Sequence, residues 1–312
     1  MKRRDWIQAS LGAVAAGAVV GRAEAKTTGL RIIDTHTHFY DPSREQGVPW
    51  PPENSPLYRT VLPEDWRKVA APCGVHETVV VEASEWVADN QWVLDLAAED
   101  KSIVGLVGNL DPHDGAFETN LRRLAANPLY RGVRWRSNLV SLTDGWDEVV
   151  AGARLLAELD LQLDINGPVE VLERVATLSS EVPELRIVID HVGGAGDPRA
   201  IKSGWAEAMQ VLAKQPKVFV KVSGMPEQTK NEWGKAPVET EFYLPILNPL
   251  WDWFGEDRLI YGSNWPVSDK GTSYASMLGI VRPFFEGKGA VAAEKYFSLN
   301  AKAAYKWVDR QA

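Results

Sequence analysis

The chain has 312 residues, of which 45% are hydrophobic and 24% are charged, and this composition excludes the disordered and fibrous classes of protein. Its formal net charge is -8, with 42 acidic against 34 basic residues, which argues against nucleic acid or an anionic membrane as a partner. We therefore expect a small-molecule partner. The single cysteine, Cys73, excludes an internal disulfide and a zinc-finger cluster.

The first 25 residues have the pattern of an export signal. Basic residues 2–4 precede an apolar stretch over residues 7–20, and Ala23-Glu24-Ala25 is similar to a signal-peptidase site. The Arg3-Arg4 pair resembles a twin-arginine signal, with an ordinary export signal or a retained anchor as alternatives. We expect cleavage after residue 25 and a single domain over residues 26–312. The mature protein is expected in the periplasm or outside the cell and not bound to a membrane. The sequence does not indicate its oligomeric state.

Eight short runs rich in β-branched residues follow one another along the rest of the chain. They lie at residues 30–34, 77–82, 103–109, 132–136, 161–165, 185–190, 218–222 and 258–261. Amphipathic segments at residues 65–71, 90–100, 116–126, 149–159, 169–179 and 204–214 predict helices between them, and a last helix is expected at 296–307. Repeated strand–helix units predict a parallel sheet, and eight of them predict an α/β fold of the (β/α)8 TIM-barrel type. A doubly wound open sheet is the alternative.

Two long segments, residues 41–62 and 225–257, follow the first and seventh predicted strands. In a barrel, the loops after the carboxyl ends of the strands form the active face. Both segments are predicted to be loops that cover a pocket. Their tryptophans, chiefly Trp50 and Trp233 and also Trp251 and Trp253, are candidates for substrate contact.

The strongest local signal is the sequence IDTHTHFYDP. Its Asp34, His36 and His38 alternate along an extended strand and so point to the same side of it. Two imidazoles at a strand end make half of a divalent-metal site. A third histidine, His191, follows the sixth run and enters a glycine-rich turn. We expect the three imidazoles to meet at one rim, and we expect Asp34, one layer below, to orient an imidazole.

In the sequence GVRWR, Arg134 and Arg136 share one face of the fourth strand. Two guanidinium groups at the barrel mouth favour an anionic substrate and could stabilise a developing oxyanion. The alternative is an ion pair with a barrel acid such as Glu82 or Asp164. Glu82, at the end of the second strand, is also the first candidate for a carboxylate metal ligand, with Asp164 as a weaker one.

With the barrel pattern, these residues resemble the amidohydrolase-related (amidohydrolase 2) family of metal-dependent TIM-barrel hydrolases, and within it the lactonase-like branch. Further stretches carry the resemblance in the family's order: PWPPENSPLYRTVLPEDW, TVVVEAS, QWVLDLAAEDKSIVGLVGNLDP, YRGVRWR, VKVSGM, LIYGSNWPV and SLNAKAAY. The resemblance covers nearly the whole chain after residue 25. It implies that His36, His38 and His191 contribute to a metal site, for zinc or manganese, or to a metal-free reaction centre.

The chain departs from the family after the eighth strand, where Asn264 stands at a position that is often an aspartate. An aspartate there would ligate the metal or deprotonate water, whereas an asparagine can only offer its amide oxygen or donate hydrogen bonds. Asp269 could replace the missing carboxylate if its loop folds inward. The expected catalytic group is therefore His191, Asn264, Arg134 and Arg136.

The function expected from these residues is hydrolysis of a small lactone that bears a carboxylate or sugar-like hydroxyls. Two alternatives are open: non-oxidative decarboxylation of an unsaturated or aromatic acid on the same barrel, and a periplasmic ligand-binding protein that has lost catalysis. The chain has no GxSxG sequence, so a serine hydrolase has little support.

Overall fold

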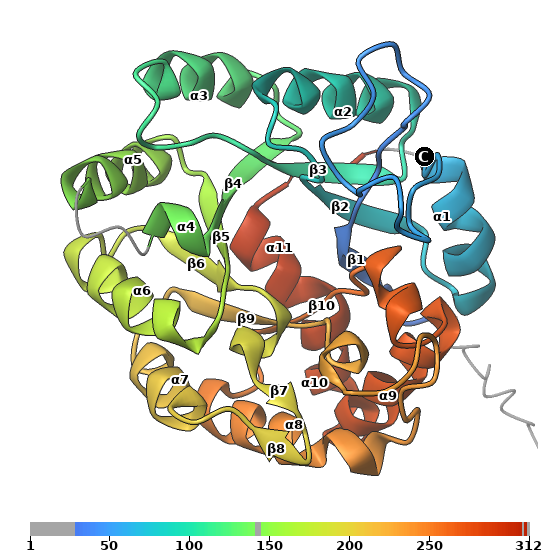
Figure 1. The fold of residues 1–312 in the computed structure, drawn as a ribbon. Coiled ribbons are helices and arrows are strands. Elements are labelled where there is room, and N and C mark those ends of the chain that lie inside the picture. Colours follow the sequence, from blue (N-terminus) through green and yellow to red (C-terminus); the bar gives the residue numbers. More distant parts are fainter. Residues whose placement is uncertain (1–28, 141–144, 308, 311–312) are drawn as a thin grey trace, which may run out of the picture.

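The computed structural model describes residues 29–140, 145–307 and 309–310, and the predicted export signal lies outside them. Eight parallel strands form one sheet in the order β1-β2-β3-β4-β5-β6-β9-β10. Figure 1 shows them around a central axis with helices outside, which confirms the predicted TIM barrel. The strands are β1 (Ile33–Thr37), β2 (Glu77–Val81), β3 (Ile103–Gly108), β4 (Tyr130–Arg136), β5 (Gln162–Asn166), β6 (Arg186–Ile189), β9 (Val218–Val222) and β10 (Leu259–Tyr261).

The helices follow the strands along the chain and cover the outside of the barrel. They are α1 (Pro63–Ala70), α2 (Val87–Glu99), α3 (Phe117–Ala125), α4 (Ser137–Val140), α5 (Trp146–Glu158), α6 (Val169–Glu181), α7 (Trp205–Ala213), α8 (Thr240–Phe254), α9 (Tyr274–Gly287) and α10 (Ala290–Glu294). Short helical turns are η1 (Ala71–Cys73), η2 (His191–Gly194), η3 (Pro226–Gln228), η4 (Val267–Lys270) and η5 (Lys295–Leu299), and a small hairpin pairs β7 (Gly196–Asp197) with β8 (Ala200–Ile201). Among the described residues, no helix combines the length and apolar character needed to cross a bilayer.

The first and last strands are joined at the carboxyl end of the barrel. The Thr35 hydroxyl donates to the Tyr261 carbonyl over 2.6 Å, and a parallel bridge links Thr37 to Trp265. The His38 amide also donates to the Trp265 carbonyl, over 2.9 Å. These bonds hold the loop after β10 beside the end of β1.

The carboxyl-terminal helix α11 (Asn300–Tyr305) closes the opposite, amino-terminal end of the barrel. Arg186, the first residue of β6, donates to the Ala304 carbonyl over 2.7 Å. Arg131, near the start of β4, donates to the Tyr305 carbonyl over 3.1 Å. Because α11 fills this end, the carboxyl-terminal end is where a pocket can form.

The predicted position of the first strand is wrong by three residues. It was placed on the apolar run 30–34, but β1 spans Ile33–Thr37 and so includes His36. The side chains of Asp34, Thr35 and Thr37 are buried and hydrogen-bonded inside the barrel, as in the 2.7 Å contact between the Thr37 and Thr78 hydroxyls. A strand whose polar groups are satisfied internally does not need the apolar pattern on which the prediction relied.

The prediction of a loop over residues 225–257 is also wrong, because α8 occupies Thr240–Phe254. Two internal prolines, Pro245 and Pro249, hid this helix, since proline removes a helical hydrogen bond and normally marks a break. Trp251 and Trp253 lie on α8 and pack against rings of neighbouring helices instead of covering a pocket.

Candidate active site

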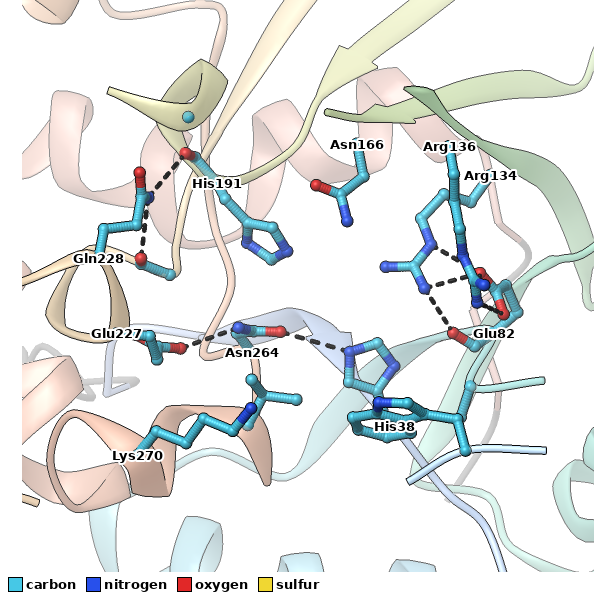
Figure 2. Close-up of a pocket in the computed structure, with 15 residues that line it drawn as sticks. His38, Glu82, Arg134, Arg136, Asn166, His191, Glu227, Gln228, Asn264 and Lys270 are labelled. Carbon is cyan, nitrogen blue, oxygen red and sulfur yellow. Dashed lines mark hydrogen bonds and ion pairs between the residues drawn. The ribbon is translucent and has the colours of Figure 1, made fainter. Parts of the chain in front are cut away.

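A cavity of about 450 Å³ opens at the carboxyl-terminal end of the barrel. Figure 2 shows side chains from several loops that converge on it. Its lining includes seven residues singled out from the sequence, which are His38, Trp50, Glu82, Arg134, Arg136, His191 and Asn264. Trp233 was also expected at the pocket, but it is not among the lining residues, and 46% of its surface is exposed.

The three histidines come together as expected. The ring centroids of His36 and His38 are 4.9 Å apart, and those of His36 and His191 are 4.4 Å apart. His36 is completely buried beneath the other two. Burial lowers the pKa of His38 to about 3 and that of His191 to about 4, so both rings are neutral at physiological pH.

Backbone carbonyls and strained turns set the orientation of these rings. His38 Nδ1 lies 2.9 Å from the Val81 carbonyl, which can only accept, so Nδ1 carries the proton and Nε2 offers a lone pair. His191 Nδ1 lies 2.9 Å from the Ser223 hydroxyl. His191 and Asn264 have φ angles of 51° and 62°, a left-handed conformation that is rare outside glycine and is concentrated at functional sites.

The two arginines share one carboxylate on the facing wall of the cavity, as Figure 2 shows. Arg134 donates to Glu82 Oε1 from Nε over 2.9 Å and from Nη2 over 2.6 Å, and Arg136 Nη2 lies 3.0 Å from both oxygens. The two arginines therefore form the ion pair with Glu82 that the sequence offered as the alternative to substrate binding. Both oxygens of Glu82 are engaged with guanidinium groups, away from the imidazole cluster for which Glu82 was considered a metal ligand.

A buried ammonium lies below the imidazoles, and the sequence reasoning missed it. Lys221 Nζ is 2.8 Å from Asp164, 3.0 Å from Asp190 and 3.1 Å from His36 Nδ1. Asp164, a weaker metal candidate in the sequence, is thus paired with Lys221. Burial opposes the charge on Asp190, but Lys221 and His36 together hold its pKa well below the usual range. A lysine in the apolar strand VFVKV was the available signal.

His36, Asp190 and His191 have ligand atoms that all lie within 4.8 Å of one another. His36 Nε2 is buried and has no hydrogen-bond partner in the described part of the chain. Imidazole nitrogens with one carboxylate are donors that zinc and manganese accept. The donor set fits a divalent ion, although one oxygen of Asp190 also forms an ion pair with Lys221. The carboxylate of this cluster is Asp190, where the sequence suggested Glu82.

Asp34 does not contact an imidazole ring, contrary to expectation. Its Oδ1 accepts from the backbone amides of His36 and Ser263, and its Oδ2 accepts from the hydroxyls of Ser263 and Tyr274. It therefore fastens β1 to the loop that carries Asn264. Asp269 does not reach the cavity either: its carboxylate lies 3.5 Å from Arg59.

Two further charged residues line the cavity and were not predicted, Glu227 on η3 and Lys270 on η4. The Asn264 amide donates to Glu227 Oε1 over 2.8 Å, and burial raises the pKa of Glu227 to about 7. The position of Glu227 in the turn that follows the seventh strand was a possible signal, but residues 225–257 were treated as one undivided loop.

A parallel eight-stranded barrel with histidines at its carboxyl-terminal rim defines an enzyme of the amidohydrolase type. Residues 33–307 match the model of the amidohydrolase family, and the chain belongs to this family. It is 32% identical to L-fucono-1,5-lactonase of Burkholderia ambifaria over 76% of this chain and 80% of that protein.

Two solved structures share the fold. One is an amidohydrolase from Burkholderia multivorans with bound zinc, with a TM-score of 0.78 and 23% identity over 89% of this chain and all of that chain. The other is a probable 2-pyrone-4,6-dicarboxylic acid hydrolase from Acinetobacter baumannii with bound citric acid, with a TM-score of 0.70 and 18% identity over 88% of this chain and 99% of that chain.

Proposed function

We propose that this protein hydrolyses a small lactone that carries sugar-like hydroxyls or a carboxylate. The observation that carries the proposal is the two-sided cavity, which has neutral imidazoles and the Asn264 amide on one side and the Arg134–Arg136 pair on the other. The relative named L-fucono-1,5-lactonase supports the same bond type. A small lactone ring fits a cavity of about 450 Å³.

The arginine wall favours a substrate with negative charge or many oxygens. Two guanidinium groups share the single carboxylate of Glu82, so this wall keeps one positive charge, and Lys270 adds another at the rim. The Arg136 side chain is 41% exposed, against 7% for Arg134, so Arg136 is the one that can reach a ligand. Guanidinium binds carboxylate and developing oxyanions well.

In the proposed reaction, the oxygen of a water molecule bonds to the ring carbonyl carbon, and the π electrons move to the carbonyl oxygen. Donors on the cavity wall stabilise that negative charge. The carbonyl then re-forms as the ring carbon–oxygen bond breaks, and the departing alkoxide takes up the proton that the attacking water has lost, which gives a hydroxy acid. The neutral ring of His38 can accept a hydrogen bond from the reacting group at its unprotonated Nε2.

We further propose that His36, Asp190 and His191 hold a divalent ion, zinc or manganese. When bound, such an ion would polarise the carbonyl and lower the pKa of water. Metal analysis of the purified protein tests this, with a divalent ion expected in the wild type and lost in His36→Ala. An equal metal content in both proteins would contradict this ligand set.

The export signal belongs to the proposal as well. Residues 1–25 carry the twin-arginine-like pattern, and we propose that the protein acts in the periplasm or outside the cell. A soluble small molecule would be its substrate there.

A panel of lactones and unsaturated or aromatic acids tests the reaction class with the purified protein. Ring opening, measured as proton release, supports the proposal. Carbon dioxide release without ring opening would identify a decarboxylase instead. Thermal stabilisation by a panel member without turnover would identify a binding protein.

Arg136→Gln should raise KM for anionic lactones more than for neutral ones.

A further inference from the structure

Two carboxylates line the cavity within the described part of the chain, Glu82 and Glu227. Glu82 is engaged by two guanidinium groups. Glu227 accepts a hydrogen bond at Oε1 from the Asn264 amide, and its buried Oε2 has no partner among the described residues. Glu227 is therefore the cavity carboxylate that no guanidinium group engages.

The other polar groups of the cavity are poorly suited to accept a proton at neutral pH. His191 is one of the proposed metal ligands, and the His38 ring contacts the Val81 carbonyl at Nδ1 and the Asn264 side chain at Nε2. Asp190 is held by Lys221 below the cavity. Lys270 ends in an ammonium, which has no lone pair. Asn264 is neutral and cannot take up a proton as a base.

We propose that Glu227 is the general base of the reaction and that Asn264 positions it. The inference rests on the proposed lactone hydrolysis. Glu227 takes a proton from the attacking water as the water oxygen bonds to the ring carbonyl carbon. It returns this proton to the alkoxide when the ring carbon–oxygen bond breaks, so the carboxylate is restored at the end of each turnover.

The surroundings of Glu227 suit this role. Burial raises its pKa to about 7, which is where a general base works best near neutral pH. The charge of Lys270 on η4 favours the ionised form of Glu227, and the charge of Asp269 on η4 opposes it. The Asn264 amide donates to Glu227 Oε1 over 2.8 Å and so fixes the position of this carboxylate.

The first test compares lactone hydrolysis by wild type and Glu227→Gln over a pH series. We expect kcat to fall by about 10²–10⁴-fold, the usual contribution of a general base, with KM little changed. The wild-type rate should decline as pH falls through about 7, and this decline should be absent from the residual rate of Glu227→Gln. Glu232→Gln, which alters a glutamate that is 77% exposed after η3, is the matched control and should behave as wild type.

A rescue variant separates a base from a structural group. Asn264→Asp in the Glu227→Gln background returns a carboxylate to the cavity next to the lost one. We expect the double variant to have a kcat at least about 10-fold higher than that of Glu227→Gln, because a base is restored within the same pair of side chains. No recovery, together with an unchanged pH profile in Glu227→Gln, would overturn the inference.

A readout without substrate keeps this test separate from that of the lactonase activity. The pKa of Glu227 is raised in the folded state, so folding binds a proton between the unfolded value near 4.5 and about 7, and wild-type stability declines as pH rises through that window. The melting temperature of Glu227→Gln minus that of wild type should therefore increase from pH 4.5 to 7 and stay constant above pH 7. A constant difference would overturn the role of Glu227 even if lactones are hydrolysed. A pH-dependent difference in a protein that opens no lactone would overturn the lactonase proposal alone.

Discussion

Lys221 shows how a single residue organises the interior of this barrel. Its side chain is completely buried and pairs with Asp164 and Asp190, which are also completely buried. Each carboxylate would be costly in this place without the ammonium. The lysine thus makes it possible to keep Asp190 charged beside His36 and His191.

Replacement of Lys221 by methionine should lower the free energy of unfolding by about 3–5 kcal/mol, because it leaves two buried carboxylates without their cation. Chemical denaturation measures this loss. The double variant Lys221→Met with Asp164→Asn should recover part of it, since one of the two stranded charges is removed. A Lys221→Met protein as stable as wild type would contradict the assigned charge on this cluster.

At the residue scale, the sequence predicted groups whose position follows from local spacing. His36, His38 and His191 were placed together because each comes at the end of a strand, and the structure places their rings side by side. The partners of each group depend on neighbouring strands, which spacing alone does not reveal. The sequence therefore left open whether the arginines bind Glu82, and it missed the pairing of Lys221 with Asp190.

At the scale of elements, the turn after β9 controls the position of the His191 ring. Gly224 has a φ of +62°, and a Cβ at this position would lie 2.7 Å from His191 Nδ1. A side chain there would meet both the strained backbone and the ring. The absence of a side chain at Gly224 is thus what leaves room for the imidazole.

We expect Gly224→Ala to lose most of its activity because the His191 ring must move. Its control is Gly74→Ala, which has a similar φ of +77° with nothing within 4 Å of the added Cβ. Both variants should lose about 1–3 kcal/mol of stability from backbone strain. Enzyme assays and melting curves measured on both proteins check this. Equal activities for the two variants would show that the ring contact is unimportant.

The elements that the sequence predicted correctly are those with uninterrupted patterns. The strands from 77–82 onward agree closely with β2 to β6, β9 and β10. Helix α8 was missed because Pro245 and Pro249 interrupt it, and β1 was misplaced because its polar residues are satisfied inside the barrel. In both cases tertiary contacts stabilise a segment whose local pattern argues against it.

At the scale of the whole molecule, the barrel has one closed end and one open end. Helix α11 fills the amino-terminal end, and the cavity occupies the carboxyl-terminal end. This division is the one expected for a TIM barrel, in which one end supports stability and the other carries chemistry. It could be predicted from the strand count, but the cavity lining could not, because it comes from loops.

The proposed export of the chain can be tested without the substrate of the enzyme. Replacement of Arg3 and Arg4 by lysine should keep the protein in the cytoplasm if a twin-arginine signal carries it. Cell fractionation with an antibody against the folded domain measures this. Undiminished export of the lysine variant would favour an ordinary export signal, and a membrane-bound full-length chain would indicate a retained anchor.

The central claim is that imidazoles gathered at the open rim support hydrolysis of a lactone. Proton release by the purified protein with L-fucono-1,5-lactone and carboxylate-bearing lactones, compared between wild type and His191→Ala, tests it most directly. We predict turnover well above the spontaneous rate in wild type and a loss of kcat/KM of at least about 100-fold in the folded variant. Equal rates in both proteins would contradict the account.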